Sequence, residues 1–416
     1  MSTDVAVLGQ KAKKAAATLA NLNSTAKNEA LLKIADGLLN NQERILAVNQ
    51  AEVAKAKTGG LKASFIERLT LNPNRIAAMV EGIREVVRLE DPVGTVEKMW
   101  RRPNGLEIGL LRVPLGVVAI IYEARPNVTV DAAALCLKTG NAVILRGGSE
   151  AIQTNQVLVE VIRETLRKTS VPEDAVQLLA SPEREAAVVL MKMRQYVDVL
   201  VPRGGAGLIR TVVDNARVPV IETGVGVCHT YVDARADLDQ AIKIVINAKT
   251  QRPSVCNALE TLLVHQAVAA AFLPRCGEEL RRAGTEIRGC PQTLSYLPWA
   301  TPATEEDWAT EYLDLILAVK VVPDFAAAVD HIAKYGSGHS ECIITTDYAT
   351  ARQFLQVVDA AAVYVNASTR YTDGYEFGLG AELGISTQKL HARGPMGLSA
   401  LTTTKYIIYG DGQIRQ

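Results

Sequence analysis

The chain has 416 residues, of which 48% are hydrophobic and 22% are charged, and its 45 Lys and Arg residues balance its 45 Asp and Glu residues. This length exceeds one ordinary hydrophobic core and predicts two or three domains. Because the net charge is zero, the chain lacks the excess of basic residues that is typical of proteins that bind nucleic acid or an anionic membrane surface. No apolar run approaches the ~18–20 residues that span a bilayer.

Residues 5–57 are predicted to form two or three helices, because apolar side chains recur there near the helical period. Ser24 or Thr25 is expected to cap one of them. Gly59-Gly60 interrupts the pattern, and helices are expected to resume at residues 65–70 and 73–88.

The same N-terminal segment bears on location. Lys11, Lys13 and Lys14 precede an Ala-rich amphipathic stretch, which lacks the continuous apolar segment of a secretory signal peptide. We expect the chain to stay in the cytoplasm.

Asn104-Gly105 lies between two stretches of strand character, residues 95–101 and 106–112. An Asn-Gly pair in such a place predicts a hairpin, since both residues tolerate the positive φ of a type I′ turn. A further strand is expected at residues 401–409. Together these strands are expected to form an arm that packs on a second subunit.

Strands and helices then alternate. Strands are expected at residues 116–122, 142–146, 175–180 and 196–201, with helices such as 130–138 between them. This order predicts a parallel sheet with right-handed crossovers, and ligands bind beyond the carboxyl ends of such strands.

Two loops after these strands are candidates for binding a nucleotide. Arg203-Gly204-Gly205 opens a helix, where backbone N–H groups can approach a phosphate, although a tight turn would use the same glycines. Arg146 ends a strand and can contact a ribose or its 2′-phosphate, or simply be solvated. Ser149 is expected to cap the helix that follows.

The six cysteines are scattered, without a C-x-x-C pair or histidines at metal-ligand spacing, so neither a disulfide framework nor a metal site is expected. Cys256 stands in the segment QRPSVCNA (251–258), 34 residues after Glu222. A buried, inert thiol is one reading. Its polar neighbours favour the other, a loop in which backbone dipoles stabilise a thiolate.

Seven short sequence motifs decide whether Cys256 is an inert or a reactive thiol. They occur in a specific order along the whole chain: YEARPNVT (122–129), LRGGSEA (145–151), VPRGG (201–205), ETGVG (222–226) with Cys228-His229, VNASTR (365–370), FGLGAELGIST (377–387) and HARGPMGL (391–398). In this order they resemble the aldehyde dehydrogenase superfamily, and within it the branch that reduces L-glutamyl 5-phosphate.

The resemblance implies an α/β fold of aldehyde dehydrogenase type, with two parallel-sheet, Rossmann-like α/β domains and a β-hairpin oligomerisation arm. An NADP(H)-binding domain is expected at residues 1–95 and 114–223. The arm is expected at 96–113 with 397–416, and a catalytic domain with the nucleophilic cysteine at 224–396.

The cofactor implied is NADPH, because Arg146 replaces a lysine of the wider superfamily and a guanidinium fork suits a 2′-phosphate. Glu311 resembles the glutamate that bonds the nicotinamide ribose. The residues expected to bind the cofactor are Arg146, Gly147, Gly148, Ser149, Arg203, Gly204, Gly205 and Glu311.

The reaction implied converts L-glutamyl 5-phosphate to L-glutamate 5-semialdehyde and phosphate, the second step of proline biosynthesis from glutamate. Cys256 is expected to form a thioester. Asn127 is expected to help hold the oxyanion, since the superfamily's Trp-Asn pair is replaced by EARPN at 123–127. Glu222 matches the base of hydrolytic relatives and is assigned proton handling here.

Arg125 and Arg370 are the candidates for the substrate carboxylate, with a structural ion pair as the alternative for each. A homo-oligomer, dimer or tetramer, and functional coupling to glutamate 5-kinase are expected, without nucleic acid or membrane. Two other functions stay open: a related reductase that uses an acyl-CoA or a free aldehyde, and a catalytically inactive nucleotide-binding scaffold.

Overall fold

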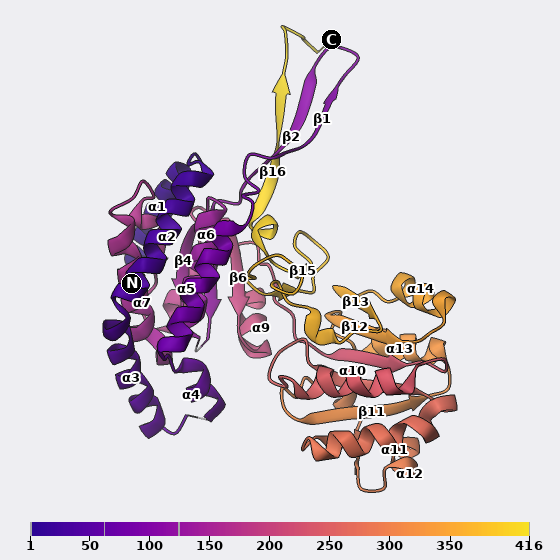
Figure 1. The fold of residues 1–416 in the computed structure, drawn as a ribbon. Coiled ribbons are helices and arrows are strands. Elements are labelled where there is room, and N and C mark those ends of the chain that lie inside the picture. Colours follow the sequence, from indigo (N-terminus) through magenta and orange to yellow (C-terminus); the bar gives the residue numbers. More distant parts are fainter. Residues whose placement is uncertain (1, 62, 124, 416) are drawn as a thin grey trace. The chain divides into compact units, whose positions relative to one another are not determined.

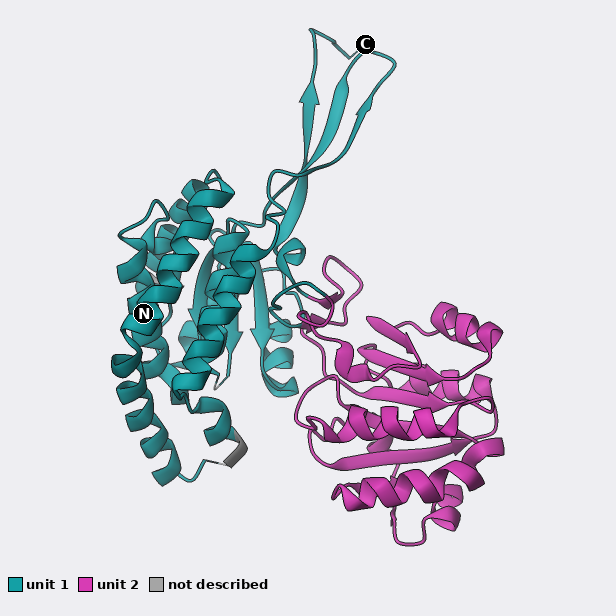
Figure 2. Cartoon of the chain, viewed as in Figure 1, with its two compact units in different colours: residues 1–222, 378–384, 396–416 teal, residues 223–377, 385–395 magenta. Residues whose placement is uncertain are grey.

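The computed structural model describes residues 2–61, 63–123 and 125–415 (Figure 1). The chain forms two compact units (Figure 2). The first unit comprises residues 1–222, 378–384 and 396–416, and the second comprises residues 223–377 and 385–395.

The first unit begins with the helices expected from the sequence: α1 (Ser2–Leu19), α2 (Ser24–Asn40), α3 (Gln42–Thr58), α4 (Ala63–Leu69) and α5 (Pro73–Arg88). The expected cap was wrong by one residue. Asn23, not Ser24 or Thr25, caps α2 by accepting a hydrogen bond from the N–H of Ala26. The hydroxyl of Ser24 instead donates to the carboxylate of Asp91, 3.0 Å away.

The predicted parallel sheet forms the centre of the first unit, and its four strands stand in the order β5-β4-β3-β6. Strand β3 is buried along its whole length. Ile121 on β3 pairs with Arg146 on β4 and with Pro202 on β6, so the carboxyl ends of these strands meet at one edge. The strands are β3 (Val117–Tyr122), β4 (Ala142–Arg146), β5 (Val176–Leu178) and β6 (Val199–Arg203).

The helices and short 3₁₀ turns between and after these strands are α6 (Pro126–Lys138), η1 (Ser149–Ala151), α7 (Ile152–Leu166), η2 (Glu173–Ala175), α8 (Arg184–Met191) and α9 (Ala206–Asn215). Helix α6 begins four residues before the expected start, because Pro126 fits the first turn of a helix, where its missing N–H costs nothing.

The expectation that Ser149 caps the next helix was wrong. Ser149 begins the short turn η1, and α7 starts at Ile152 without a cap from its own side chains. The buried carboxylate of Glu52 on α3 takes this role by accepting hydrogen bonds from the N–H groups of Gln153 (2.9 Å) and Thr154 (3.1 Å). A contact between helices far apart in sequence therefore replaces a local cap.

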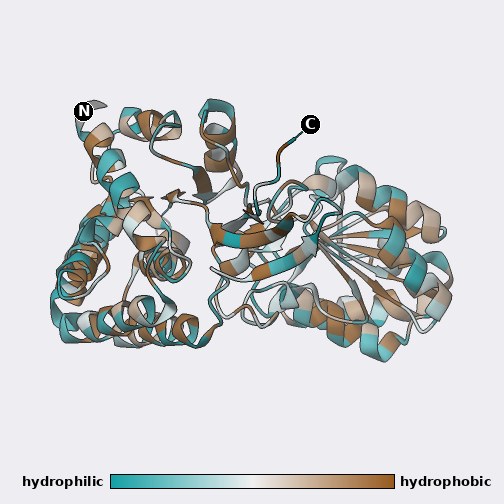
Figure 3. Cartoon of the chain, turned by 90° about the horizontal axis from the view of Figure 1, so that it is seen from above, coloured by the Kyte–Doolittle hydropathy of each residue, from teal (hydrophilic) through white to brown (hydrophobic). Residues whose placement is uncertain are grey.

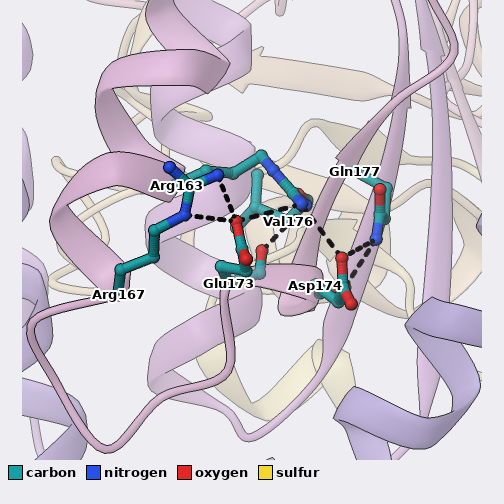
Figure 4. A network of polar contacts seen from close by, with 6 residues as sticks. All are labelled: Arg163, Arg167, Glu173, Asp174, Val176 and Gln177. Carbon is teal, nitrogen blue, oxygen red and sulfur yellow. Dashed lines mark hydrogen bonds and ion pairs between the residues drawn. The ribbon is translucent and has the colours of Figure 1, made fainter.

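At its other end α7 is tied to η2 and β5 by an arginine network (Figure 4). Arg163 donates to the backbone carbonyls of Glu173 (3.0 Å) and Val176 (2.9 Å) and to the carboxylate of Asp174 (3.0 Å). Arg167 donates to the carboxylate of Glu173. These bonds fix the edge strand of the sheet against the helix that covers it.

An antiparallel three-stranded sheet forms the arm, in the order β1-β2-β16, with strands β1 (Val96–Arg101), β2 (Glu107–Pro114) and β16 (Thr402–Tyr409); the 3₁₀ turn η5 (Leu398–Leu401) precedes β16. The hairpin is confirmed, but its expected turn type was wrong. Gly105 has φ +90°, whereas Asn104 has no positive φ, and the Gly105 N–H donates to the carbonyl of Arg102. This bond makes Pro103 and Asn104 the central residues of the turn, where a type I′ turn needs positive φ, and the proline ring fixes a negative one.

The second unit is built on a seven-stranded parallel sheet, in the order β10-β9-β11-β8-β7-β12-β13. Its strands are β7 (Cys228–Val232), β8 (Leu259–His265), β9 (Glu286–Gly289), β10 (Thr301–Pro302), β11 (Ile316–Val322), β12 (Ser340–Ile344) and β13 (Ala362–Val365); β14 (Ile385–Ser386) and β15 (Gly394–Pro395) form a separate pair.

Helices surround this sheet: α10 (Leu238–Thr250), α11 (Gln266–Arg282), α12 (Pro291–Tyr296), α13 (Phe325–Tyr335) and α14 (Tyr348–Val357), with the 3₁₀ turns η3 (Glu306–Ala309) and η4 (Thr369–Tyr371). Hydrophilic and hydrophobic residues alternate along the helices (Figure 3), as expected for helices with one face on a core. None of the described helices is both long and apolar enough to cross a bilayer.

Candidate active site

Cys256 lies in the loop 251–258 between α10 and β8, and it is the partly exposed one among six cysteines. The other five are buried. Burial raises the pKa of Cys276 and of Cys342 to about 12 and raises that of Cys136 further, so these thiols stay protonated and unreactive. Exposure thus singles out Cys256 as the candidate nucleophile.

The backbone of Cys256 is clamped by the segment 226–228. A Cβ added to Gly226 would lie 1.6 Å from the carbonyl oxygen of Cys256, so only glycine allows this approach. The thiol of Cys228 donates to the same carbonyl, 3.2 Å away. The Gly226 N–H donates to the carboxylate of Glu311 at 2.8 Å, and burial raises the pKa of that carboxyl. Glu311 and Cys256 therefore share Gly226 as a neighbour.

A fully buried ion pair joins the two ends of the cysteine loop. Lys249 on α10 lies 2.6 Å from Glu260 on β8, and the other carboxylate oxygen of Glu260 accepts the N–H of Leu313. Burial raises the pKa of Glu260 to about 7 and lowers that of Lys249, and each shift is opposed by the partner's charge. The pair fixes both stems of the loop and the segment that follows Glu311.

Arg370 fastens a second loop to the cysteine loop. Its guanidinium donates to the side-chain oxygens of Asn257 and, at 2.9 Å, of Gln251. The amide of Asn257 donates in return to the carbonyl of Thr372 (2.8 Å). Three of the predicted site residues, Cys256, Glu311 and Arg370, are thus brought together within the second unit.

Buried polar side chains lie beneath these loops. Glu341 accepts hydrogen bonds from the N–H (2.9 Å) and the ring Nδ1 (3.0 Å) of His229, and burial raises its pKa. His339 contacts Ser340 at 2.8 Å, and burial lowers its pKa to about 4. Within the described ranges, no three His, Cys, Asp or Glu side chains gather as a metal site would require.

Arg146 and Arg203 lie at the carboxyl edge of the sheet in the first unit. The Nη2 of Arg146 donates to the carbonyl of Pro182 at 3.3 Å, while its buried Nε has no hydrogen-bond partner among the described residues. Burial lowers the pKa of Arg146, and the charge of Glu150 opposes this. A buried N–H donor without an acceptor fits a residue that binds an anionic ligand. Gly147, Gly148 and Ser149 follow Arg146 directly.

Gly204 and Gly205 open α9, which has no side-chain cap. The Gly205 N–H donates to the carboxylate of Glu123 at 3.2 Å, and a Cβ on Gly204 would lie 2.7 Å from that carboxyl carbon. The positive end of the helix therefore already attracts one anionic group. This arrangement and the unpartnered Nε of Arg146 fit the phosphates of a dinucleotide.

The remaining predicted residues belong to the first unit. Asn127 is exposed on the first turn of α6 and donates to Asp131 at 3.0 Å, and burial raises the pKa of Asp131 to about 6. Arg125 precedes α6, and Glu222 is the last residue of the unit's first segment. Their roles toward Cys256 stay predictions.

Sequence reasoning missed four residues that build the cysteine loop: Asn257, Cys228, Lys249 and Glu260. One signal was available. Glu260 stands in the largely apolar run ALETLLV, where a charge is costly unless a partner neutralises it. The partner itself was not identifiable, because its position on the buried face of α10 follows from tertiary packing.

Comparison with known proteins gave three findings. The model of the aldehyde dehydrogenase family matches residues 2–286. Gamma-glutamyl phosphate reductases from Carboxydothermus hydrogenoformans and Moorella thermoacetica are 64% and 62% identical to this chain, over 99% and 100% of both sequences. The crystal structure of gamma-glutamyl phosphate reductase from Thermotoga maritima matches with a TM-score of 0.97 at 50% identity, and the match covers 99% of this chain and 100% of that chain.

Proposed function

Since the chain belongs to the aldehyde dehydrogenase family, and within it to the gamma-glutamyl phosphate reductases, we propose that it reduces L-glutamyl 5-phosphate with NADPH. The products are L-glutamate 5-semialdehyde, inorganic phosphate and NADP⁺, and the reaction is the second step of proline biosynthesis from glutamate. The observation that carries the proposal is full-length identity of 62–64% to two such reductases. The partly exposed, clamped Cys256 is proposed to supply the chemistry.

NADPH, when bound, supplies the hydride that reduces the acyl carbon. Residues of the first unit would hold it: Arg146 the 2′-phosphate through its fork of N–H donors, and Gly204-Gly205 the diphosphate at the start of α9. Gly147, Gly148, Ser149 and Arg203 line the same strand ends. Glu311 of the second unit is assigned to the nicotinamide ribose.

Cys256 carries the covalent step. Its thiolate attacks the acyl carbon, so that a C–S bond forms, the C–O bond to phosphate breaks, and the electron pair leaves with the phosphate. A thioester splits one difficult reduction into two easier steps. The backbone N–H of Cys256 and the amide of Asn127 are assigned to the oxyanion, where one donor contributes about 3–4 kcal/mol. After reduction, collapse of the thiohemiacetal releases the aldehyde and restores the thiol.

The roles of three polar residues complete the proposal. Glu222 handles a proton and does not activate water, since hydrolysis of the thioester would waste the substrate. Arg125 and Arg370 are the two candidates for the α-carboxylate of the substrate, because guanidinium groups bind carboxylates through paired hydrogen bonds.

The experiment follows absorbance of NADPH with freshly made glutamyl phosphate, and in the reverse direction follows NADP⁺ with glutamate semialdehyde and phosphate. Turnover in both directions is expected. Turnover with an acyl-CoA or with free aldehyde in the absence of phosphate, and none with the phosphate substrates, would replace this assignment.

We propose further that the arm binds a second copy of the chain in a dimer or tetramer. On one face of this sheet, Trp100 and Ile408 flank Ile108, and Tyr406 pairs with Leu110. Tyr406 and Ile408 are 65% and 58% exposed, and apolar side chains on a lone three-stranded sheet need a cover. Light scattering of the Ile408→Lys variant should show smaller assemblies than wild type. The control, Lys405→Ser, changes a residue on the opposite face of the same strand and should leave the assembly unchanged.

The substrate is an acyl phosphate, which water hydrolyses, so we propose functional coupling to the glutamate 5-kinase that makes it, with the cytoplasm as the expected location. Addition of that kinase and ATP to the assay should support NADPH oxidation from glutamate. The rate of NADPH oxidation should be higher with the kinase present than with glutamyl phosphate that was prepared beforehand and has partly hydrolysed. Equal rates would argue against coupling.

A further inference from the structure

We propose that Arg252 and Arg370 together form the subsite for the phosphate group of the substrate, and for the inorganic phosphate product, beside Cys256. The inference rests on the proposed function and deepens it. It reassigns Arg370, one of the two candidates for the α-carboxylate, and leaves Arg125 for that group.

The first argument is position. Gln251, directly before Arg252, accepts a hydrogen bond from the Nε of Arg370, and Asn257, directly after Cys256, accepts one from its Nη1. The guanidinium of Arg370 is therefore held across the loop that carries the nucleophile. In an acyl phosphate the phosphate is bonded through one oxygen to the carbon under attack, whereas the α-carboxylate lies at the far end of the substrate.

The second argument is the state of Arg252. Its side chain is exposed and forms no ion pair or hydrogen bond with another residue in the part of the chain that the structure describes. Arg252 stands four residues before Cys256 in the same loop, and an exposed guanidinium without a protein partner is available for an anionic ligand.

The third argument is charge. The Nε of Arg370 donates at 2.9 Å to Gln251, the residue next to Arg252, so the fold brings the two arginines near one another. Burial, and next the charge of Arg252, lower the pKa of Arg370, while Asp373 and the two nearby cysteines, Cys256 and Cys228, oppose this. The carboxylate of Asp373 is already engaged by the N–H of Tyr375, at 2.9 Å. Two cations with one engaged carboxylate suit a dianion better than a singly charged carboxylate, and phosphate is the dianion of this reaction.

The subsite has a chemical consequence. As the thiolate of Cys256 forms the C–S bond, the C–O bond to phosphorus breaks and the leaving oxygen takes the electron pair. Guanidinium N–H groups next to that oxygen stabilise the negative charge as it develops. In the reverse direction the same groups hold inorganic phosphate for attack on the thioester.

The experiment compares Arg252→Gln with wild type in the reverse reaction, varying phosphate and semialdehyde separately. The KM for phosphate should rise about 10-fold or more, as for loss of a charge-assisted hydrogen bond, while the KM for semialdehyde stays unchanged. Arg252→Lys should fall between the two. The control is Arg282→Gln on α11, whose side chain is exposed and pairs with Glu278 and Glu279.

A second measurement needs no turnover. Inorganic phosphate should slow alkylation of Cys256 by iodoacetamide in wild type and in Arg282→Gln, and should not in Arg252→Gln, as followed by intact mass. An unchanged phosphate KM with retained protection, or a raised KM for semialdehyde instead, overturns the subsite. Absence of turnover in wild type would instead remove the proposed function, and protection by phosphate would still test the subsite.

Discussion

At the scale of single residues, environment separates chemically identical groups. Six thiols are present, and the chain buries five of them while leaving the sixth partly open in a loop whose backbone is fixed by Gly226 and Cys228. A thiolate needs solvent or dipoles for its charge, so this difference in burial decides which sulfur can react.

Replacement of Cys256 tests this directly. Cys256→Ala is expected to reduce turnover below detection, because the thioester cannot form, while NADPH still binds with the wild-type Kd, measured by its fluorescence. Cys276→Ala, which removes a buried thiol from α11, is the matched control and should keep turnover. An active Cys256→Ala enzyme would assign the nucleophile to another residue.

We propose that cofactor choice also depends on one residue, Arg146. Arg146→Ala should weaken NADPH binding about 10-fold or more and NADH binding little, since only NADPH carries the 2′-phosphate that a guanidinium fork pairs with. Titration of nucleotide fluorescence gives both Kd values without turnover. Equal losses for the two nucleotides would count against the 2′-phosphate role.

At the scale of elements, long-range contacts replace the local signals that sequence suggested. The N-terminus of α7 has no cap of its own and depends on Glu52, which reaches it from α3. A carboxylate there satisfies two N–H groups and also meets the positive end of the helix dipole.

Loss of this charge is therefore expected to destabilise the first unit. Glu52→Gln should lower the free energy of unfolding by about 1–2 kcal/mol, the range for a lost helix cap, as measured by urea denaturation. Gln50→Ala on the exposed face of the same helix is the control and should change little. No loss in Glu52→Gln would show that the amide oxygen alone suffices.

At the scale of the whole molecule, buried neutral histidines make stability depend on pH. Burial, with the charges of His229, Lys320 and Lys334, lowers the pKa of His331 from 6.5 to about 3. Its ring packs against Trp308 and Tyr335 and its Nδ1 lies 3.2 Å from the Nζ of Lys320. The folded chain therefore keeps this ring neutral where the unfolded chain protonates it.

Stability should fall as pH falls below about 6.5, because the unfolded state then binds a proton that the folded state excludes until about pH 3. At pH 5 the loss from His331 is about 2 kcal/mol, at 1.36 kcal/mol per pH unit. Urea midpoints at pH 7.5 and 5 should differ less in His331→Gln than in wild type. His391→Gln, at an exposed position, should keep the wild-type difference.

Much of the fold, and the residues of the candidate site, could be predicted from the sequence. The N-terminal helices, the parallel strands and the Arg-Gly-Gly loops follow from periodicity and glycine placement, and Cys256 and Arg370 from motifs in order along the chain. Three local features were predicted wrongly. At α2 the sequence offers Asn23 beside Ser24 and Thr25, and local preference does not choose among adjacent cap residues. The cap of α7 comes from Glu52 on a distant helix, and in the hairpin the turn closes one residue earlier than the Asn-Gly pair suggested, with Pro103 at a central position.

The amino-acid sequence by itself determined the family and the reaction, because these depend on which residues occur in which order, and it predicted Cys256 as the nucleophile. Tertiary structure alone decided which thiol is exposed, that Lys249 and Glu260 pin the cysteine loop, and that Arg370 lies across it. Burial and pairing are properties of the packed chain: a charge or a thiol takes its pKa from neighbours that the fold brings from distant positions.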